Sequence, residues 1–193
     1  MTAALRPLPC VETIRPTATM PSAAATRRAV LSAGIALLAA GCAGGRTFVA
    51  RPMPVDVAAA TALADRFRAE NGLPPVAPDA RLGAIAAEQA MAMATAGRMS
   101  HSLGWGRGLP SRLAAGGYDW EVTAENLGAG YPTLAAAFAG WIGSSGHRAN
   151  LLKERVTEFG IAAAESPGSE YRTFWAMILA TPRRLPAGAP VEG

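Results

Sequence analysis

Cysteine, lysine and histidine are scarce in this chain of 193 residues, and each scarcity limits what the protein can be. The two cysteines, Cys10 and Cys42, precede the stretch that we interpret as globular. We therefore expect a domain without a disulfide, stabilised by packing. Lys153 is the only lysine, and His101 and His147 are the only imidazoles available for a metal site or for acid–base chemistry.

The excess of positive charge belongs mostly to the N-terminal part of the chain. The full sequence has 18 Lys+Arg and 14 Asp+Glu, a formal net charge of +4. Four of those arginines and one of those glutamates precede residue 42, which leaves 14 basic and 13 acidic side chains in the rest. Nucleic-acid binding needs several cations on one face, so we expect no nucleic-acid partner.

Residues 1–41 have the features of an N-terminal extension followed by a signal peptide for twin-arginine export. Arg27 and Arg28 precede an apolar run over 29–40, which is too short for a typical membrane span. The run ends in small residues before Cys42, an arrangement similar to a lipobox. We expect cleavage before Cys42, diacylation of this residue and hence a stable membrane anchor, with Met20 as the true start.

Two alternatives remain open for this segment. A short buried helix with an incidental cysteine would also be apolar. Ala39 stands at the third position before Cys42, where leucine is usual, so cleavage without lipidation is the second alternative. Export predicts a periplasmic or cell-surface, membrane-anchored lipoprotein.

Composition and periodicity divide the rest of the chain. Residues 42–54 are predicted to be the lipidated cysteine and a tether, 55–181 a domain, and 182–193 a flexible tail. Helical spacing of apolar residues predicts helices over 55–71, 79–97, 109–115, 132–144 and 147–152. Strands are predicted over 122–128, 159–164 and 171–180, and the last two are expected to pair as a hairpin. This pattern favours an α+β fold.

Single side chains inside the domain carry further expectations. Pro132 suits the first turn of its helix. Met99 is expected to fill the core. Trp105, Tyr118 and Trp120 are candidates for exposed aromatics at the rim of a cleft, although Trp120 fits the core equally well.

Several short motifs follow one another in the domain. They are Asn71-Gly72-Leu73-Pro74-Pro75, Met99-Ser100-His101, Glu125-Asn126-Leu127, Trp141 with Gly146-His147-Arg148-Ala149-Asn150-Leu151-Leu152, and Glu158-Phe159-Gly160-Ile161 with the aromatic strand over 171–175. In order and spacing, over roughly residues 58–180, they resemble the CAP superfamily of cysteine-rich secretory proteins, antigen 5 and plant pathogenesis-related proteins. The resemblance implies an α-β-α sandwich, in which helices flank a small antiparallel sheet with a central cleft.

The same resemblance implies that His101, Glu125 and His147 meet in that cleft. Eukaryotic members place two histidines and two glutamates there, and Ser144 stands at the position of the second glutamate. Two imidazoles and a carboxylate suit zinc or another divalent cation. Such a metal lowers the pKa of a bound water and supports hydrolysis, with Glu125 as ligand or base. Alternatively, Glu125 is structural and its carboxylate accepts backbone N–H bonds.

Other residues are assigned to the cleft by their place in these motifs. The additional cleft residues are Ser144, Ser145, Asn126 and Arg148. Glu158 is a further carboxylate that no motif assigns to the site.

Two functions are compatible with these observations. The first is an extracytoplasmic binding module, anchored through Cys42, that holds a lipid, a peptide or a cell-wall component in the cleft or a nearby apolar groove. The second is a metal-dependent hydrolase or peptidase that uses His101, His147 and Glu125. The missing second glutamate favours the binding module, with the histidines as an accessory metal site.

Overall fold

The computed structural model of the protein describes residues 47–103 and 108–183. The predicted signal peptide, Cys42, Trp105 and most of the predicted tail lie outside the described residues. In the described part, the helices are α2 (Val57–Ala69), α3 (Ala80–Ala96), α4 (Leu109–Ala115), α5 (Leu134–Gly143) and α6 (Ser145–Leu151), and the strands are β1 (Arg51–Met53), β2 (Ala77–Pro78), β3 (Trp120–Ala129), β4 (Glu158–Glu165) and β5 (Thr173–Pro182).

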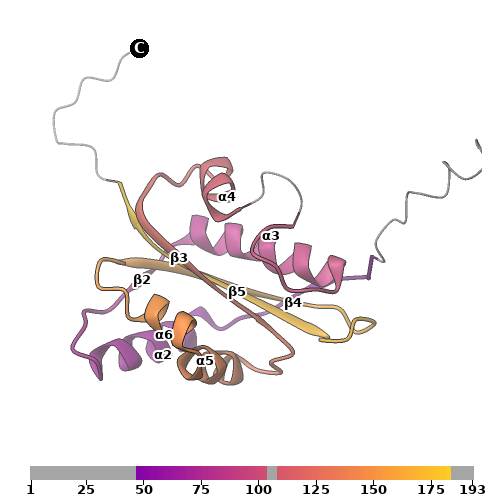
Figure 1. Ribbon diagram of the computed structural model, residues 1–193, viewed down its shortest axis with the longest axis horizontal. Coiled ribbons are helices and arrows are strands. Elements are labelled where there is room, and N and C mark those ends of the chain that lie inside the picture. The colour runs from indigo at the N-terminus through magenta and orange to yellow at the C-terminus, as the bar shows by residue number, and fades with distance from the viewer. Residues whose placement is uncertain (1–46, 104–107, 184–193) are drawn as a thin grey trace, which may run out of the picture. The chain divides into compact units, whose positions relative to one another are not determined.

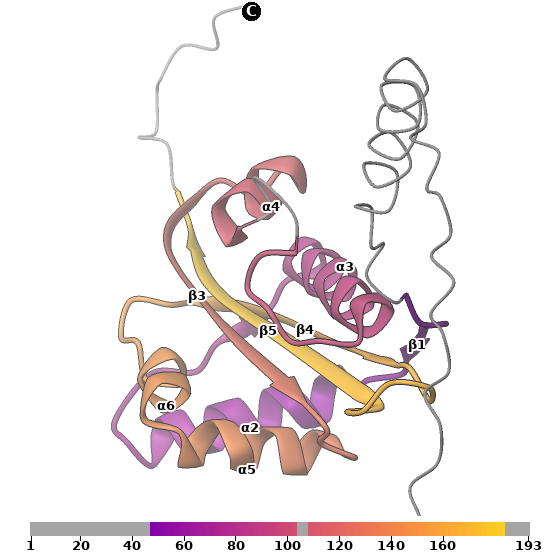
Figure 2. The same ribbon diagram turned by 45° about the vertical axis from the view of Figure 1, so that its right-hand side comes forward.

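These elements form three layers, with the sheet in the middle (Figure 1). Helices α3 and α4 cover one face of the sheet, and α2, α5 and α6 cover the other, as a second view confirms (Figure 2). The predicted α+β fold, an α-β-α sandwich, is therefore confirmed. None of the helices in the described ranges is both long enough and apolar enough to span a bilayer.

Local signals in the sequence fix the ends of the helices. Asp79 caps α3, because its Oδ1 accepts a hydrogen bond from the Leu82 N–H at 2.9 Å, and Gly97 ends the helix with φ 63°. Thr133 caps α5 in the same way by accepting from the Ala136 N–H. Pro132 therefore precedes the cap, and its predicted place in the first turn is wrong.

The strands pair in the order β1-β4-β5-β3, and β2 adds a two-residue parallel pair to β4. The other pairings are antiparallel, and the predicted β4–β5 hairpin is confirmed. Every residue of β5 from Phe174 to Ala180 is buried, as expected for a strand covered on both faces. Strand β3 forms one edge of the sheet.

Strand β1 lies within the segment that the sequence predicts as a tether. Its residues pair with β4, with Arg51 opposite Glu165 and Met53 opposite Ala163. Ahead of it, the Phe48 N–H donates to the Thr95 carbonyl at 2.8 Å. The sheet therefore begins before residue 55. A strand of three residues has no periodicity to detect, and its Pro52 is tolerated because the strand lies at an edge.

Each face of the sheet has its own hydrophobic core. Phe138, Trp141 and Trp175 are fully buried under α5, and Leu82 and Met93 of α3 are fully buried on the other face. Met99 does not fill the core as predicted, because it follows the end of α3 and is 49% exposed.

Helix α3 lies directly on β4 at Gly160. A Cβ atom built on Gly160 would be 2.1 Å from the Leu82 carbonyl carbon and 2.2 Å from the Gly83 nitrogen. Both are backbone atoms of the helix, so no side chain can move away to make room. The absence of a side chain at residue 160 therefore sets the distance between helix and sheet.

Gly160→Ala is expected to lower the free energy of unfolding by roughly 1–3 kcal/mol, because the helix must shift away from the strand. Gly83→Ala is the matched control, since a Cβ there meets nothing within 4 Å. In mid-helix this control should raise stability by about 0.5–1 kcal/mol. Urea unfolding followed by circular dichroism measures both, and equal effects would contradict the close approach.

Candidate functional site

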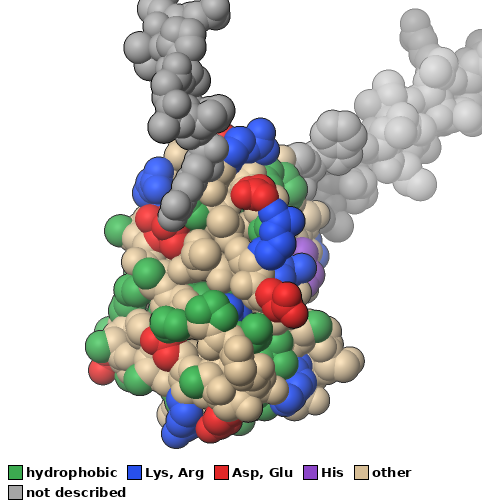
Figure 3. Space-filling model, turned by 90° about the vertical axis from the view of Figure 1, so that its left-hand side faces the viewer, with side chains coloured by type: hydrophobic (Ala, Val, Ile, Leu, Met, Phe, Trp, Pro, Cys, Tyr) green, Lys and Arg blue, Asp and Glu red, His purple; other side chains and the backbone are tan. Residues whose placement is uncertain are grey.

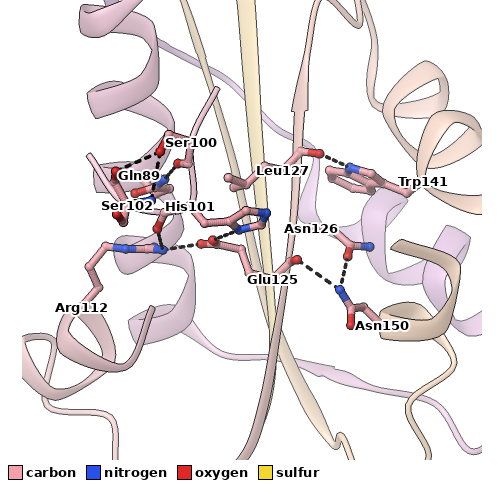
Figure 4. Close-up of polar contacts among 10 residues, drawn as sticks. All are labelled: Gln89, Ser100, His101, Ser102, Arg112, Glu125, Asn126, Leu127, Trp141 and Asn150. Atoms are coloured by element: carbon pink, nitrogen blue, oxygen red, sulfur yellow. Dashed lines mark hydrogen bonds and ion pairs between the residues drawn. The ribbon is translucent and has the colours of Figure 1, made fainter. Parts of the chain in front are cut away.

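Glu125 occupies the middle of β3, and its side chain lies on the α3–α4 face of the sheet. The side chain is 3% exposed. Its Oε2 lies 2.7 Å from His101 Nδ1, and its Oε1 accepts a hydrogen bond from Arg112 Nη2 at 2.6 Å (Figure 4). The carboxylate is thus held between two nitrogen donors instead of the backbone N–H groups that the sequence allowed.

The loop that carries His101 is fixed from two helices. Gln89, a buried polar residue in the apolar stripe of α3, donates to the Ser100 carbonyl at 2.6 Å. Arg112 of α4 donates to the His101 carbonyl at 3.4 Å as well as to Glu125. Neither Arg112 nor this role of Gln89 was predicted. The only signal in the sequence was a glutamine among apolar residues.

This arrangement sets the direction of the His101 ring. Nδ1 faces a carboxylate that is also paired with a guanidinium, so the hydrogen-bond network assigns the proton to Nδ1. Nε2 is the opposite ring nitrogen, and the side chain is 64% exposed. His101 therefore presents a lone pair at Nε2 for a ligand N–H or O–H, for a cation, or for a proton.

Helix α6 is attached to the outer edge of β3 by two asparagines. Asn126 donates to the His147 carbonyl at 3.0 Å. Asn150 donates to the Asn126 side chain at 2.9 Å and to the Glu125 carbonyl at 3.2 Å. Both bonds of Asn150 appear on the right of Figure 4. The pair holds the α6 turn that carries His147 beside the strand that carries Glu125.

The two histidines approach the edge of β3 from opposite layers of the sandwich. Burial, and then the charge of His101, hold the pKa of His147 below its ordinary value. The electrostatic effect of one imidazole on the other agrees with their expected proximity. We call His101, Arg112, Glu125, Asn126, His147 and Asn150 the central site.

The remaining predicted cleft residues lie around α6. Ser144 is partly buried and precedes α6, and Ser145 is exposed in its first turn. The Arg148 guanidinium lies over the Phe67 ring of α2, 5.0 Å from its centroid, and donates to Asn71. The cleft role of these three residues stays a prediction.

Two further expectations are settled by one contact. Glu158 accepts a hydrogen bond from the Tyr118 hydroxyl at 2.6 Å, and that phenol is 1% exposed. Burial, and then Glu158, raise the pKa of Tyr118 above its ordinary value. Tyr118 is therefore a core residue and not a rim aromatic, and Glu158 serves as its partner. Trp120 is partly buried against the same core.

The geometry limits how this site can hold a metal. Among the described residues, no group of three His, Cys, Asp or Glu side chains is arranged to hold an ion. Arg112 and His101 each bond one oxygen of Glu125, so its role as a metal ligand stays a prediction. A carboxylate bonded to Nδ1 instead orients a histidine. Metal binding by the two histidines stays a prediction.

Two hollows lie in the helical layers on either side of the sheet. A cavity of about 210 Å³ between α3 and α4 has Gln89, Arg112 and Leu103 in its wall. A groove of about 630 Å³ between α2 and α5 is lined mainly by apolar atoms, including those of Leu63 and Leu134.

Comparison with known proteins agrees with this architecture. The model of the cysteine-rich secretory protein family, CAP, matches residues 61–179. A crystal structure of an extracellular protein with an SCP domain from Bacillus anthracis is similar, with 28% identity and a TM-score of 0.55. The match covers 62% of this chain and only 38% of that one.

A second solved structure shows the same fold at lower identity. An outer surface protein from Borrelia burgdorferi has 16% identity and a TM-score of 0.61, and the match covers 70% of this chain and 100% of that one. A search of curated proteins found no match.

Arg112→Met is expected to lower the free energy of unfolding by about 3 kcal/mol, because it removes one partner of a buried carboxylate. Adding Glu125→Leu should restore part of the loss, since no charge is then left buried. His101→Ala should cost less than about 1 kcal/mol, because its ring is largely exposed. Urea unfolding of the wild type, Arg112→Met, Glu125→Leu and the double variant gives the coupling, and additive losses would contradict the pairing.

The depressed pKa of His147 predicts a dependence of stability on pH. The unfolded chain binds this proton near pH 6.5, whereas the folded protein binds it only at lower pH. The contribution of His147 to the free energy of unfolding therefore falls as the pH is lowered from 6.5 towards the folded pKa, and it is complete above pH 6.5. His147→Gln should flatten this part of the profile in thermal unfolding. Superimposable profiles for the two proteins would contradict the shift.

Proposed function

The chain belongs to the cysteine-rich secretory protein (CAP) family, and on this basis we propose that it is an exported, membrane-anchored binding module. The ligand is a component of the cell envelope, and the central site holds it. The alternative is a metal-dependent hydrolase that uses His101, His147 and Glu125.

The hydrogen bonds of Glu125 are the observation that favours the binding module over the hydrolase. Each oxygen of Glu125 already bonds a nitrogen of the protein, Oε2 that of His101 and Oε1 that of Arg112, which favours an orienting role over that of a base or a metal ligand. Its side chain is 3% exposed and paired with the Arg112 guanidinium, so it is held inside the protein. Such a residue supports a site and does not react in it.

The groups that surround the site favour a polar ligand. The lone pair at His101 Nε2 accepts from a hydroxyl or amide. The Ser144 and Ser145 hydroxyls, which we expect in the cleft, both donate and accept. A cell-wall fragment or a peptide offers such groups, and a lipid chain does not. The apolar groove between α2 and α5 is the place for a lipid chain.

Export is supported by two independent features. The sequence has a twin-arginine pattern and an apolar run before Cys42. The similar protein from Bacillus anthracis is described as extracellular. The anchor itself is proposed from the sequence, with acylation of Cys42.

Binding to insoluble peptidoglycan sacculi tests the proposed role against hydrolysis. We expect the purified protein to sediment with the sacculi and to release no soluble fragments, with or without added zinc. Ser145→Trp places a bulky side chain at the exposed start of α6 and should reduce sedimentation severalfold. Glu154→Gln, an exposed change away from the site, is the control and should bind as the wild type does.

The opposite outcome is equally specific. Zinc-dependent release of fragments that is abolished in Glu125→Gln would contradict the binding module and support the hydrolase. Calorimetric titration with zinc, beside a His101→Ala/His147→Ala variant, shows separately whether the two imidazoles hold a metal. If the protein neither sediments with the sacculi nor releases fragments from them, the wall is excluded as the ligand. Attention then turns to the apolar groove.

A further inference from the structure

Large hydrophobic side chains are exposed at only four positions of the described residues. They are Val49, Val57, Met99 and Tyr171, with exposures of 89, 43, 49 and 43%. Single exposed apolar residues are ordinary, but a gathering of them at one place is not. Three of the four gather at one end of the sandwich, and Val57 lies elsewhere, beside the middle of β4.

Pairing and packing put Val49, Met99 and Tyr171 at the same end. The last row of the sheet joins Arg51, Glu165 and Thr173, and Tyr171 precedes this row in the β4–β5 turn. The Phe48 ring bridges the layers there. It contacts Gly97 at the end of α3 and lies 3.7 Å from the Cβ position of Gly168 in the turn.

In Figure 1 this is the right-hand end of the domain, where β1, the end of α3 and the β4–β5 turn come together. We call it the anchor end and define it by Val49, Met99 and Tyr171 with the arginines at 51, 98 and 172.

The charges of the anchor end suit an acidic surface. Arg98 and Arg172 are exposed, and Arg51 is exposed but paired with Glu165. The acidic side chains of this end are Glu165 and the exposed Glu170. Three cations against two anions leave a small positive balance around the apolar side chains.

The opposite end of the domain differs in its charged side chains, which form ion pairs with one another. Figure 3 looks onto it and shows acidic and basic side chains next to one another. Ion pairs link Arg155 with Glu121 and Arg183 with Asp119 at that end. A surface in which both signs are paired is suited to water.

The length of chain between Cys42 and the domain limits where a membrane can be. Five residues separate Cys42 from Phe48, the residue that packs against α3. A fully extended chain spans at most about 3.3–3.6 Å per residue, so Phe48 lies within roughly 20 Å of an acylated Cys42. Phe48 packs at the anchor end, next to Val49, so the short tether favours this end as the one nearest the lipid.

We propose that the anchor end lies against the bilayer, with Val49, Met99 and Tyr171 in the headgroup layer and the arginines among anionic lipid headgroups. This inference rests on the proposed anchoring at Cys42. The sheet then stands upright on the membrane, because its strands run from the anchor end to the opposite end. Glu125 lies in the middle of β3, four residues before Ala129 at the anchor end, so the central site faces sideways above the lipid surface.

Hydrogen–deuterium exchange of a tethered protein tests this orientation. The full chain with Cys10→Ser is coupled through Cys42 to a maleimide lipid in vesicles of phosphatidylcholine and phosphatidylglycerol. The same chain capped with a soluble maleimide, at equal concentration and without vesicles, is the reference. We expect slower exchange on vesicles in residues 97–100 and 168–172, and no change in residues 153–157 of the opposite end.

Matched variants identify the side chains responsible. The slower exchange on vesicles should disappear in the triple variant Val49→Ser/Met99→Ser/Tyr171→Ser. It should be reduced in Met99→Ser alone, a single exposed change that leaves the fold intact. Val57→Ser, with the same exposure as Tyr171, should keep it. Unchanged exchange at the anchor end on vesicles would overturn the proposal. Slower exchange at this end when the concentration of the capped protein is raised would also overturn it, by showing that a second copy covers this end.

The proposed anchor is tested separately, by the mass of the Cys42 peptide from protein recovered in membranes of a producing bacterium. A mass without acyl chains contradicts the anchoring, whereas the vesicle comparison decides the orientation by itself, because the tether there is chemical.

Discussion

A single buried carboxylate organises one side of this protein. Glu125 is almost inaccessible to water, so burial of its charge requires a compensating partner. Arg112 supplies one partner and so fixes where α4 lies on the sheet. His101 supplies the other and so fixes the loop after α3. The cost of burying the charge is offset by bonds that also fix the direction of the His101 ring.

The other half of the site depends on β3 being an edge strand. An edge exposes backbone carbonyls, and this protein covers them with side chains from α5 and α6 instead of another strand. Trp141 donates to the Leu127 carbonyl at 2.9 Å, and Asn150 donates to the Glu125 carbonyl. Residue 125 therefore links the two helical layers. Its side chain bonds residues of the α3–α4 layer, and its backbone carbonyl accepts from Asn150 of α6. The loop that carries His101 and the turn that carries His147 are therefore both attached to this edge.

The sequence predicted what local signals determine. Asp79 and Gly97 mark the ends of α3 in the sequence and in the structure, and the turn over 166–169 predicted the hairpin. Short or distant contacts were missed. β1 has no periodicity of its own, and the Arg112–Glu125 pair joins a helix to a strand without any spacing rule. The resemblance indicated that His101 and Glu125 are neighbours, but only coordinates show that the glutamate orients the histidine.

The orientation of His101 is the claim on which the proposed binding role depends most directly. Nitrogen-15 NMR of the folded protein at neutral pH distinguishes the two tautomers of each histidine, and a His147→Gln sample assigns the resonances. We predict that neutral His101 carries its proton on Nδ1, bonded to Glu125, with a lone pair on Nε2 for the ligand. A neutral His101 with its proton on Nε2 would contradict this account, because Glu125 would then not orient the ring and Nε2 would have no lone pair for the ligand.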